Sequence, residues 1–306
     1  MLGSLRKAEY AELAILFLIQ GAAMAIWFVP LGPILDAHGL HTIKPYAFAA
    51  SAVAAFISPL MFGAMADRHV APARVLRWLA VAPAISMALV STAIKARAHP
   101  WLILLLIQIF YFSYAPMFSI SSALILARLQ DAQKEFGPIR SMATIGWMIG
   151  GLLVSLFSLD TSVGAGYLGA AFWLAVGIFT CFLPLLEVPP AVANLTWRER
   201  FGLDALTLLK NRDHRVIFIT TTLFNIPIAA FYPFAPAHLR DLGLIHTSAW
   251  MSLAQGSEII AMFSLAWLLL KWRLKWSVAG GLGIGVLRFA LSALNTEGAL
   301  LFGIFR

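Results

Sequence analysis

The sequence has little that could form a disulfide framework, a metal site or a hydrolytic centre. Its 306 residues include one cysteine, Cys181, which lies in an apolar segment. The seven histidines fall in loops or near segment ends, and none stands at metal-ligand spacing from another. Neither a nucleophile motif nor a glycine-rich phosphate loop is visible. We therefore expect no enzymatic activity, no metal and no cofactor.

Charged residues are also scarce. They make up 12% of the chain, against 61% hydrophobic residues, and the mean hydropathy is +0.85. This composition excludes a soluble globular protein and indicates a polytopic protein in a lipid bilayer. The net charge of +8 would suggest a nucleic-acid partner in a soluble domain, but here the basic residues cluster in alternate loops. We expect no nucleic-acid partner. A membrane sensor, the other class considered, would normally add a soluble signalling domain, and none is visible.

Long apolar runs predict nine membrane-spanning helices and the start of a tenth. They lie at about 11–34, 46–65, 75–94, 101–127, 139–158, 163–186, 215–237, 248–270 and 276–294. If the N-terminus is cytoplasmic, sixteen lysines and arginines fall on the inner side and four on the outer side, namely Lys44, Lys95, Arg97 and Arg240. The positive-inside rule therefore predicts a cytoplasmic N-terminus.

The longest polar connection divides the chain after the sixth span. It predicts an N-terminal six-helix bundle at 1–187, a cytoplasmic linker with an amphipathic helix at 188–213, and an incomplete C-terminal bundle at 214–306. Six spans, a linker and further spans are the plan of the major facilitator superfamily. The loop that contains Asp67-Arg68 resembles that superfamily's signature, although its later glycine and paired basic residues are absent. We expect an all-α membrane protein of this superfamily.

One acid, Glu258, lies near the middle of the eighth predicted span. A charge at this depth costs about 3 kcal/mol on insertion scales, so it usually marks a solute path or a proton relay. Gln255 precedes it by three residues and shares its helix face. The alternative is a protonated, hydrogen-bonded glutamate in the helix core. Arg288 in span nine is expected at a similar depth, where an ion pair with Glu258 would lower the insertion cost of both.

Span five carries a stripe of three functional side chains. Arg140, Thr144 and Trp147 stand at i, i+4 and i+7, on one face. A guanidinium, a hydroxyl and an indole there form a plausible site for a polyhydroxylated ring. The alternative is a snorkelling arginine beside a core tryptophan. Span seven carries Tyr232 and three prolines, which predict a kinked or broken helix beside a cavity.

Several stretches together resemble the bacterial nucleoside:proton symporter family. They are Arg128-Leu-Gln, Pro138-Ile-Arg140 with Thr144, Gln255-x-x-Glu258, the linker 202–211, and Leu287-Arg288-Phe-Ala-Leu. In that family the matching arginine, threonine, glutamine and glutamate line the nucleoside cavity.

The resemblance implies nucleoside and protons as partners of a monomer in the bacterial inner membrane, which works by alternating access. Substrate would touch Arg140, Thr144, Trp147 and Gln255, with Tyr232 as a further contact. Glu258 would carry the coupling proton and Arg288 would tune it. Two departures concern base recognition: the family's span-seven amides align with Ala229 and Tyr232, and its span-five phenylalanine is Trp147.

The related lactose permease family shares Phe136-Gly137, Arg140, Gly146-Trp147, Glu258 and Arg288. Its members also need a span-four glutamate, and that position is Ser122 here. The shared residues make a sugar (oligosaccharide):proton symporter the alternative, and the missing glutamate argues against it. Both resemblances imply twelve spans, so we expect that the chain is truncated in the tenth.

Overall fold

The computed structural model describes residues 2–68, 71–183, 196 and 203–292, and this part of the chain is helical. The elements are α1 (Leu2–Phe28), α2 (Leu31–Ala37), α3 (Lys44–Arg68), α4 (Pro72–Lys95), α5 (Pro100–Tyr114), α6 (Met117–Leu126), α7 (Ala132–Leu156), α8 (Gly164–Phe179), the 3₁₀ helix η1 (Leu203–Lys210), α10 (Arg212–Asp241), α11 (Thr247–Leu253), α12 (Gly256–Lys271) and α13 (Leu274–Ser292).

Five stretches of the described residues are long and apolar enough to cross a membrane. They are Tyr10–Ala37, Pro72–Lys95, Pro100–Leu126, Glu135–Leu156 and Arg212–Asp241. The outside of the bundle is apolar as well, since Phe56 and Trp78 are 77% and 70% exposed. A surface of this kind suits lipid rather than water. The protein is an integral membrane protein.

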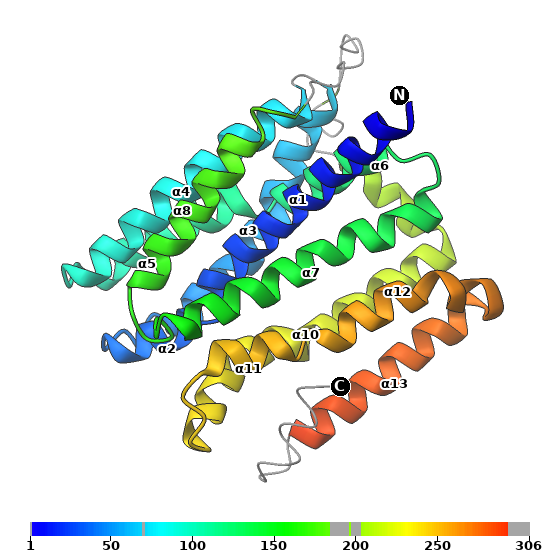
Figure 1. The fold of residues 1–306 in the computed structure, drawn as a ribbon. Helices are drawn as coiled ribbons and strands as arrows, with labels where there is room; N and C mark the ends of the chain where they lie inside the picture. Colours follow the sequence, from blue (N-terminus) through cyan, green and yellow to red (C-terminus); the bar gives the residue numbers. More distant parts are fainter. Residues whose placement is uncertain (1, 69–70, 184–195, 197–202, 293–306) are drawn as a thin grey trace.

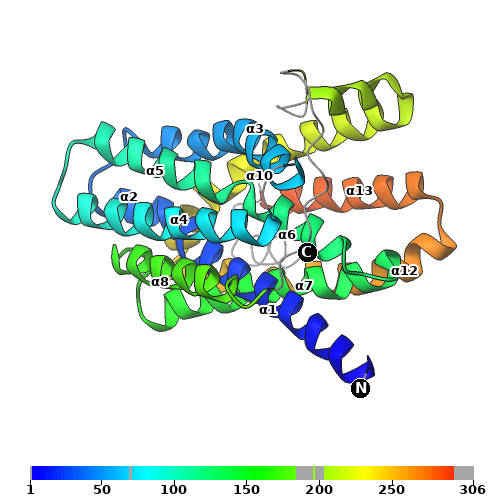
Figure 2. The ribbon, with the colours of Figure 1, turned by 90° about the horizontal axis from the view of Figure 1, so that it is seen from above.

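The helices form two groups, which we call the N-terminal bundle (α1–α8) and the C-terminal group (α10–α13). Figure 1 shows the first in blue to green and the second in yellow to red, with α7 beside α12 at the boundary. The main apolar core lies inside the N-terminal bundle. Figure 2 shows the same arrangement from above.

Small residues let α1 and α7 pack closely. A Cβ at Gly21 would collide with the backbone carbonyl of Ala143, and one at Gly146 would collide with that of Leu18. Close backbone approach through glycine is a usual basis of helix association in membranes. The α1–α7 contact therefore fixes the helix that carries the predicted stripe of site residues.

Three of the predicted spans consist of two helices each. Span one divides between α1 and α2 at Val29–Pro30. Span four divides between α5 and α6 at Ala115–Pro116, because a proline lacks the N–H needed to continue the helical hydrogen bonds. Span eight divides between α11 and α12 at Ala254–Gln255 without a proline, and the Gln255 N–H turns back to the Ser252 carbonyl, 3.0 Å away. Span seven was predicted to be kinked or broken, and it is not broken: α10 runs through Pro227, Pro233 and Pro236 without interruption.

Several predicted features lie partly outside the described residues. The predicted amphipathic helix of the linker is described only from Leu203, where a 3₁₀ helix runs to Lys210. The side chains of Asp67 and Arg68, at the end of α3, are not described. The predicted start of a tenth span also lies outside the described residues.

A polar network joins the two helix groups at the end where α7 stops and α11 begins. The Asp160 carboxylate is 7% exposed and accepts hydrogen bonds from the Ser248 N–H at 2.8 Å and the Ser155 hydroxyl at 3.2 Å. The Thr247 hydroxyl donates to the same carboxylate oxygen at 3.5 Å. The Ala249 N–H donates to the Ser155 hydroxyl at 2.9 Å. A carboxylate of the N-terminal bundle thus accepts two of its three described hydrogen bonds from the C-terminal group.

Candidate functional site

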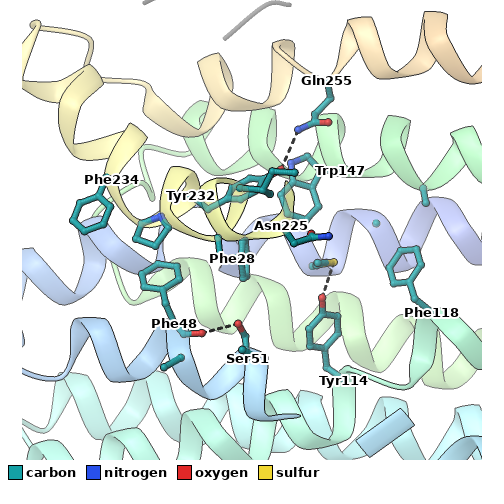
Figure 3. A pocket seen from close by; sticks show the side chains of 18 of the residues that line it. Phe28, Phe48, Ser51, Tyr114, Phe118, Trp147, Asn225, Tyr232, Phe234 and Gln255 are labelled. Atoms are coloured by element: carbon teal, nitrogen blue, oxygen red, sulfur yellow. Dashed lines mark hydrogen bonds between the residues drawn. The ribbon is translucent and has the colours of Figure 1, made fainter. Parts of the chain in front are cut away.

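A cavity of about 900 Å³ lies between the N-terminal bundle and the C-terminal group. Its lining comes from α1, α3, α5, α6, α7, α10 and α12, together with the loop before α3 and the turn before α12 (Figure 3). Pockets for small molecules usually measure about 300–1,000 Å³. The cavity is therefore large enough for a solute of two joined rings. Within the described residues no group of three or more His, Cys, Asp or Glu side chains could hold a metal ion.

The predicted stripe on α7 faces this cavity, because Arg140, Thr144 and Trp147 are all among its lining residues. The Arg140 guanidinium lies over two aromatic rings, 4.9 Å from the Phe118 centroid and 5.5 Å from that of Phe17. Such cation–π contacts hold the plane of the guanidinium while its N–H edge stays available for hydrogen bonds.

Polar side chains of the C-terminal group meet the stripe. Glu258 on α12 and Gln255 in the turn before it both line the cavity. The Thr144 hydroxyl donates to the Glu258 carboxylate at 3.3 Å, across the boundary between the two helix groups. The Gln255 amide donates to the Tyr232 hydroxyl at 3.4 Å. Gln255 and Glu258 thus lie at the cavity beside the break between α11 and α12.

Three rings form an aromatic cluster, which we define as Phe28, Trp147 and Tyr232. Phe28 lies 5.3 Å from Tyr232 and 6.0 Å from Trp147, and Trp147 lies 5.9 Å from Tyr232, all between ring centroids. In the described part of the structure the buried indole N–H of Trp147 has no hydrogen-bond partner. The cluster therefore gives the cavity an aromatic wall, with its rings tilted against one another, that contains one unused donor.

Arg288 is placed differently from the other predicted site residues. It does not belong to the described lining of the cavity. Its guanidinium lies 4.4 Å from the centroid of the Phe231 ring, in the C-terminal group. The predicted ion pair between Arg288 and Glu258 stays a prediction.

Sequence reasoning missed many of the lining residues, among them Phe28, Tyr114 and Asn225. Phe28 ends α1 and carries no signal in the sequence. Tyr114 precedes Pro116, and a proline in mid-span is a usable signal for a helix break beside a cavity. Asn225 is a polar residue within a span, and that placement is the signal that could have identified it. Ser122, at the position of the lactose permease glutamate, donates to the Phe118 carbonyl of its own helix at 2.7 Å.

A family model described as "Nucleoside H+ symporter" matches residues 8–303. The chain belongs to this family. The expected membership in the nucleoside:proton symporters is therefore confirmed, and with it an all-α fold of the major facilitator type. The lactose permease alternative is not favoured.

Relatives in Escherichia coli strain K12 support this membership. The chain is 28% identical to YegT over 294 residues, which are 91% of this chain and 66% of YegT. It is 26% identical to the nucleoside permease NupG over 302 residues, which are 92% of this chain and 70% of NupG. This family member thus spans about two thirds of the length of these relatives.

Solved structures of NupG show the same fold. The crystal structure of a single-residue mutant of the nucleoside transporter NupG superposes with a TM-score of 0.83 at 25% identity, covering 97% of this chain and 78% of that one. A second NupG crystal structure gives a TM-score of 0.78.

Proposed function

We propose that the protein moves nucleosides together with protons across the bacterial cytoplasmic membrane, with its N-terminus in the cytoplasm. The observation that carries this proposal is the hydrogen bond between Thr144 and Glu258. It places an intramembrane acid beside the stripe on α7, in a cavity between two helix groups. The family description and the likeness to the permease NupG support nucleosides as the substrate class.

The substrate would lie across the boundary between the helix groups. A nucleobase can stack against Trp147, and the amide of Gln255 can offer both a donor and an acceptor to its edge. Arg140 offers a fork of N–H donors to a base carbonyl or a sugar hydroxyl. Tyr232 contacts both Trp147 and Gln255, so we assign it as a further contact of the same site.

Glu258 would couple substrate movement to the proton. As a carboxylate it only accepts hydrogen bonds, as it does from Thr144, whereas its protonated form can donate one to a substrate. Protonation also removes a charge that is costly inside the membrane. The protonated, substrate-loaded protein can then change access as the two helix groups rock around the cavity. Arg288 would tune the proton affinity of Glu258 through its charge.

Uptake of labelled uridine by cells that lack their own nucleoside carriers tests the proposed substrate class. We expect uptake in cells that express the protein, competition by unlabelled adenosine, and none by lactose or melibiose at the same concentration. Inhibition by the disaccharides but by no nucleoside contradicts the proposal.

Removing one hydroxyl tests the placement of the substrate. Thr144→Val should raise KM, because it deletes a cavity-lining hydroxyl that bonds to Glu258. Ser122→Ala is the matched control, since that hydroxyl bonds to a carbonyl of its own helix. Equal KM values for the two variants would argue against Thr144 as a substrate contact.

A further inference from the structure

Tyr114 is a cavity-lining side chain that the proposed mechanism does not use. It is the last residue of α5, and the break before α6 at Pro116 follows it directly. Non-helical backbone at membrane depth is tolerated where it borders a cavity. Figure 3 shows Tyr114 and Gln255 on opposite sides of the cavity, at a similar level along the helices. Tyr114 therefore belongs to the wall that faces the proposed base-reading amide.

The ring of Tyr114 is held in place, whereas its hydroxyl is weakly engaged. The ring stacks on Phe110, with 5.5 Å between centroids and 10° between planes, and lies 5.7 Å from Trp173. The hydroxyl donates to the sulfur of Met24 at 3.0 Å. A thioether is a weak acceptor. A solute oxygen could therefore replace the sulfur without moving the ring.

The neighbouring Tyr111 has a hydroxyl in different surroundings from that of Tyr114. It lies on the same helix and is 0% exposed, in the core of the N-terminal bundle. In the described structure its hydroxyl is buried without a hydrogen-bond partner, and Tyr111 is not among the described lining residues of the cavity. Of these two phenols on α5, only that of Tyr114 reaches the solute space.

We propose that Tyr114 is a specificity residue that exchanges its bond to Met24 for a hydrogen bond with a hydroxyl group on the sugar of the substrate. A phenol both donates and accepts, as a sugar hydroxyl does, whereas a base carbonyl only accepts. Trp147 and Gln255 supply the stacking surface and the base-edge contacts, and Tyr114 faces them from the other wall. This inference rests on the proposed function, because it assumes a substrate that carries a ribose.

The test measures labelled uridine uptake by wild type, Tyr114→Phe and Tyr111→Phe in cells without their own nucleoside carriers. Unlabelled 2′-, 3′- and 5′-deoxyuridine serve as competitors. Tyr114→Phe keeps the stacked ring and should raise the KM for uridine about two- to tenfold, the effect of one neutral hydrogen bond, with kcat nearly unchanged. One deoxy analogue should inhibit wild type and Tyr114→Phe with the same Ki, because it lacks the hydroxyl that Tyr114 reads.

Tyr111→Phe should leave KM unchanged. An unchanged KM in Tyr114→Phe overturns the inference, and so does an equal loss of affinity for uridine and all three analogues. A rise in the KM for uridine of the same size in Tyr111→Phe overturns it as well. If wild type takes up no uridine, the proposed function is wrong and the inference fails with it. If wild type takes up uridine but Tyr114→Phe has an unchanged KM, only the inference is wrong.

Discussion

Removal of the Asp160 carboxylate should loosen the contact between the two helix groups. Alternating access requires the end of α7 and the start of α11 to separate, and the bond from the Ser248 N–H to Asp160 must then break. A hydrogen bond to a charged group contributes about 1.5–3 kcal/mol, and each 1.4 kcal/mol is about tenfold in an equilibrium. Asp160→Ala should therefore raise the population with separated ends about 10- to 100-fold.

Labelling of a cysteine inside the cavity measures this population. The native Cys181 is exposed, so the background is Cys181→Ser, and Ala229→Cys places a thiol on the lining. Intact cells are treated with a membrane-impermeant maleimide, and the rate at which the thiol is labelled is measured. While the state with separated ends is rare, this rate is proportional to the population of that state. We expect the rate to rise 10- to 100-fold on adding Asp160→Ala.

Asp241→Asn is the matched control, because Asp241 is an exposed acid at the end of α10 and its side chain makes no described hydrogen bond to the N-terminal bundle. An unchanged labelling rate in Asp160→Ala would refute the reasoning, provided that the variant reaches the membrane in normal amount. An equal increase in Asp241→Asn would show that loss of any acid at this end has the effect, and would refute it too.

Two further changes probe packing and charge. Gly21→Ala should lower the free energy of unfolding by about 1–3 kcal/mol, because the added methyl collides with the Ala143 carbonyl. Gly281→Ala is the control, since its added methyl meets open space. On heating in detergent, Gly21→Ala should unfold at a lower temperature than wild type, and Gly281→Ala should not. Arg288→Ala should reduce the amount of protein in the membrane, because the Glu258 carboxylate loses its predicted partner at a cost of about 3–5 kcal/mol. Adding Glu258→Ala should restore that amount in part. Wild-type expression of the single Arg288 variant would remove the pairing argument.

The location of the site could be predicted from the sequence where a local rule applied. Arg140, Thr144 and Trp147 line the cavity because helical spacing alone places them on one face. Glu258 could be found because an acid in mid-span is costly and therefore conspicuous. The boundaries of most helices followed from the length of the apolar runs.

Contacts between distant segments could not be predicted in the same way. Asp160 is separated by 88 residues from Ser248, and neither residue is unusual in its own segment. The break at Ala254–Gln255 has no proline or glycine pair before it, whereas the three prolines of α10 are accommodated within the helix. Backbone breaks in membrane helices depend on what neighbouring helices supply, and that information lies elsewhere in the chain.

The most direct test of the account is the proton movement that accompanies uridine entry. Uridine is added to a weakly buffered, de-energised suspension of cells that express wild type or Glu258→Gln, and the external pH is followed. The account predicts a rise in pH with wild type and none with Glu258→Gln, which should still exchange labelled for unlabelled uridine. A rise of wild-type size with Glu258→Gln would contradict the assignment of Glu258 as the site of the coupling proton.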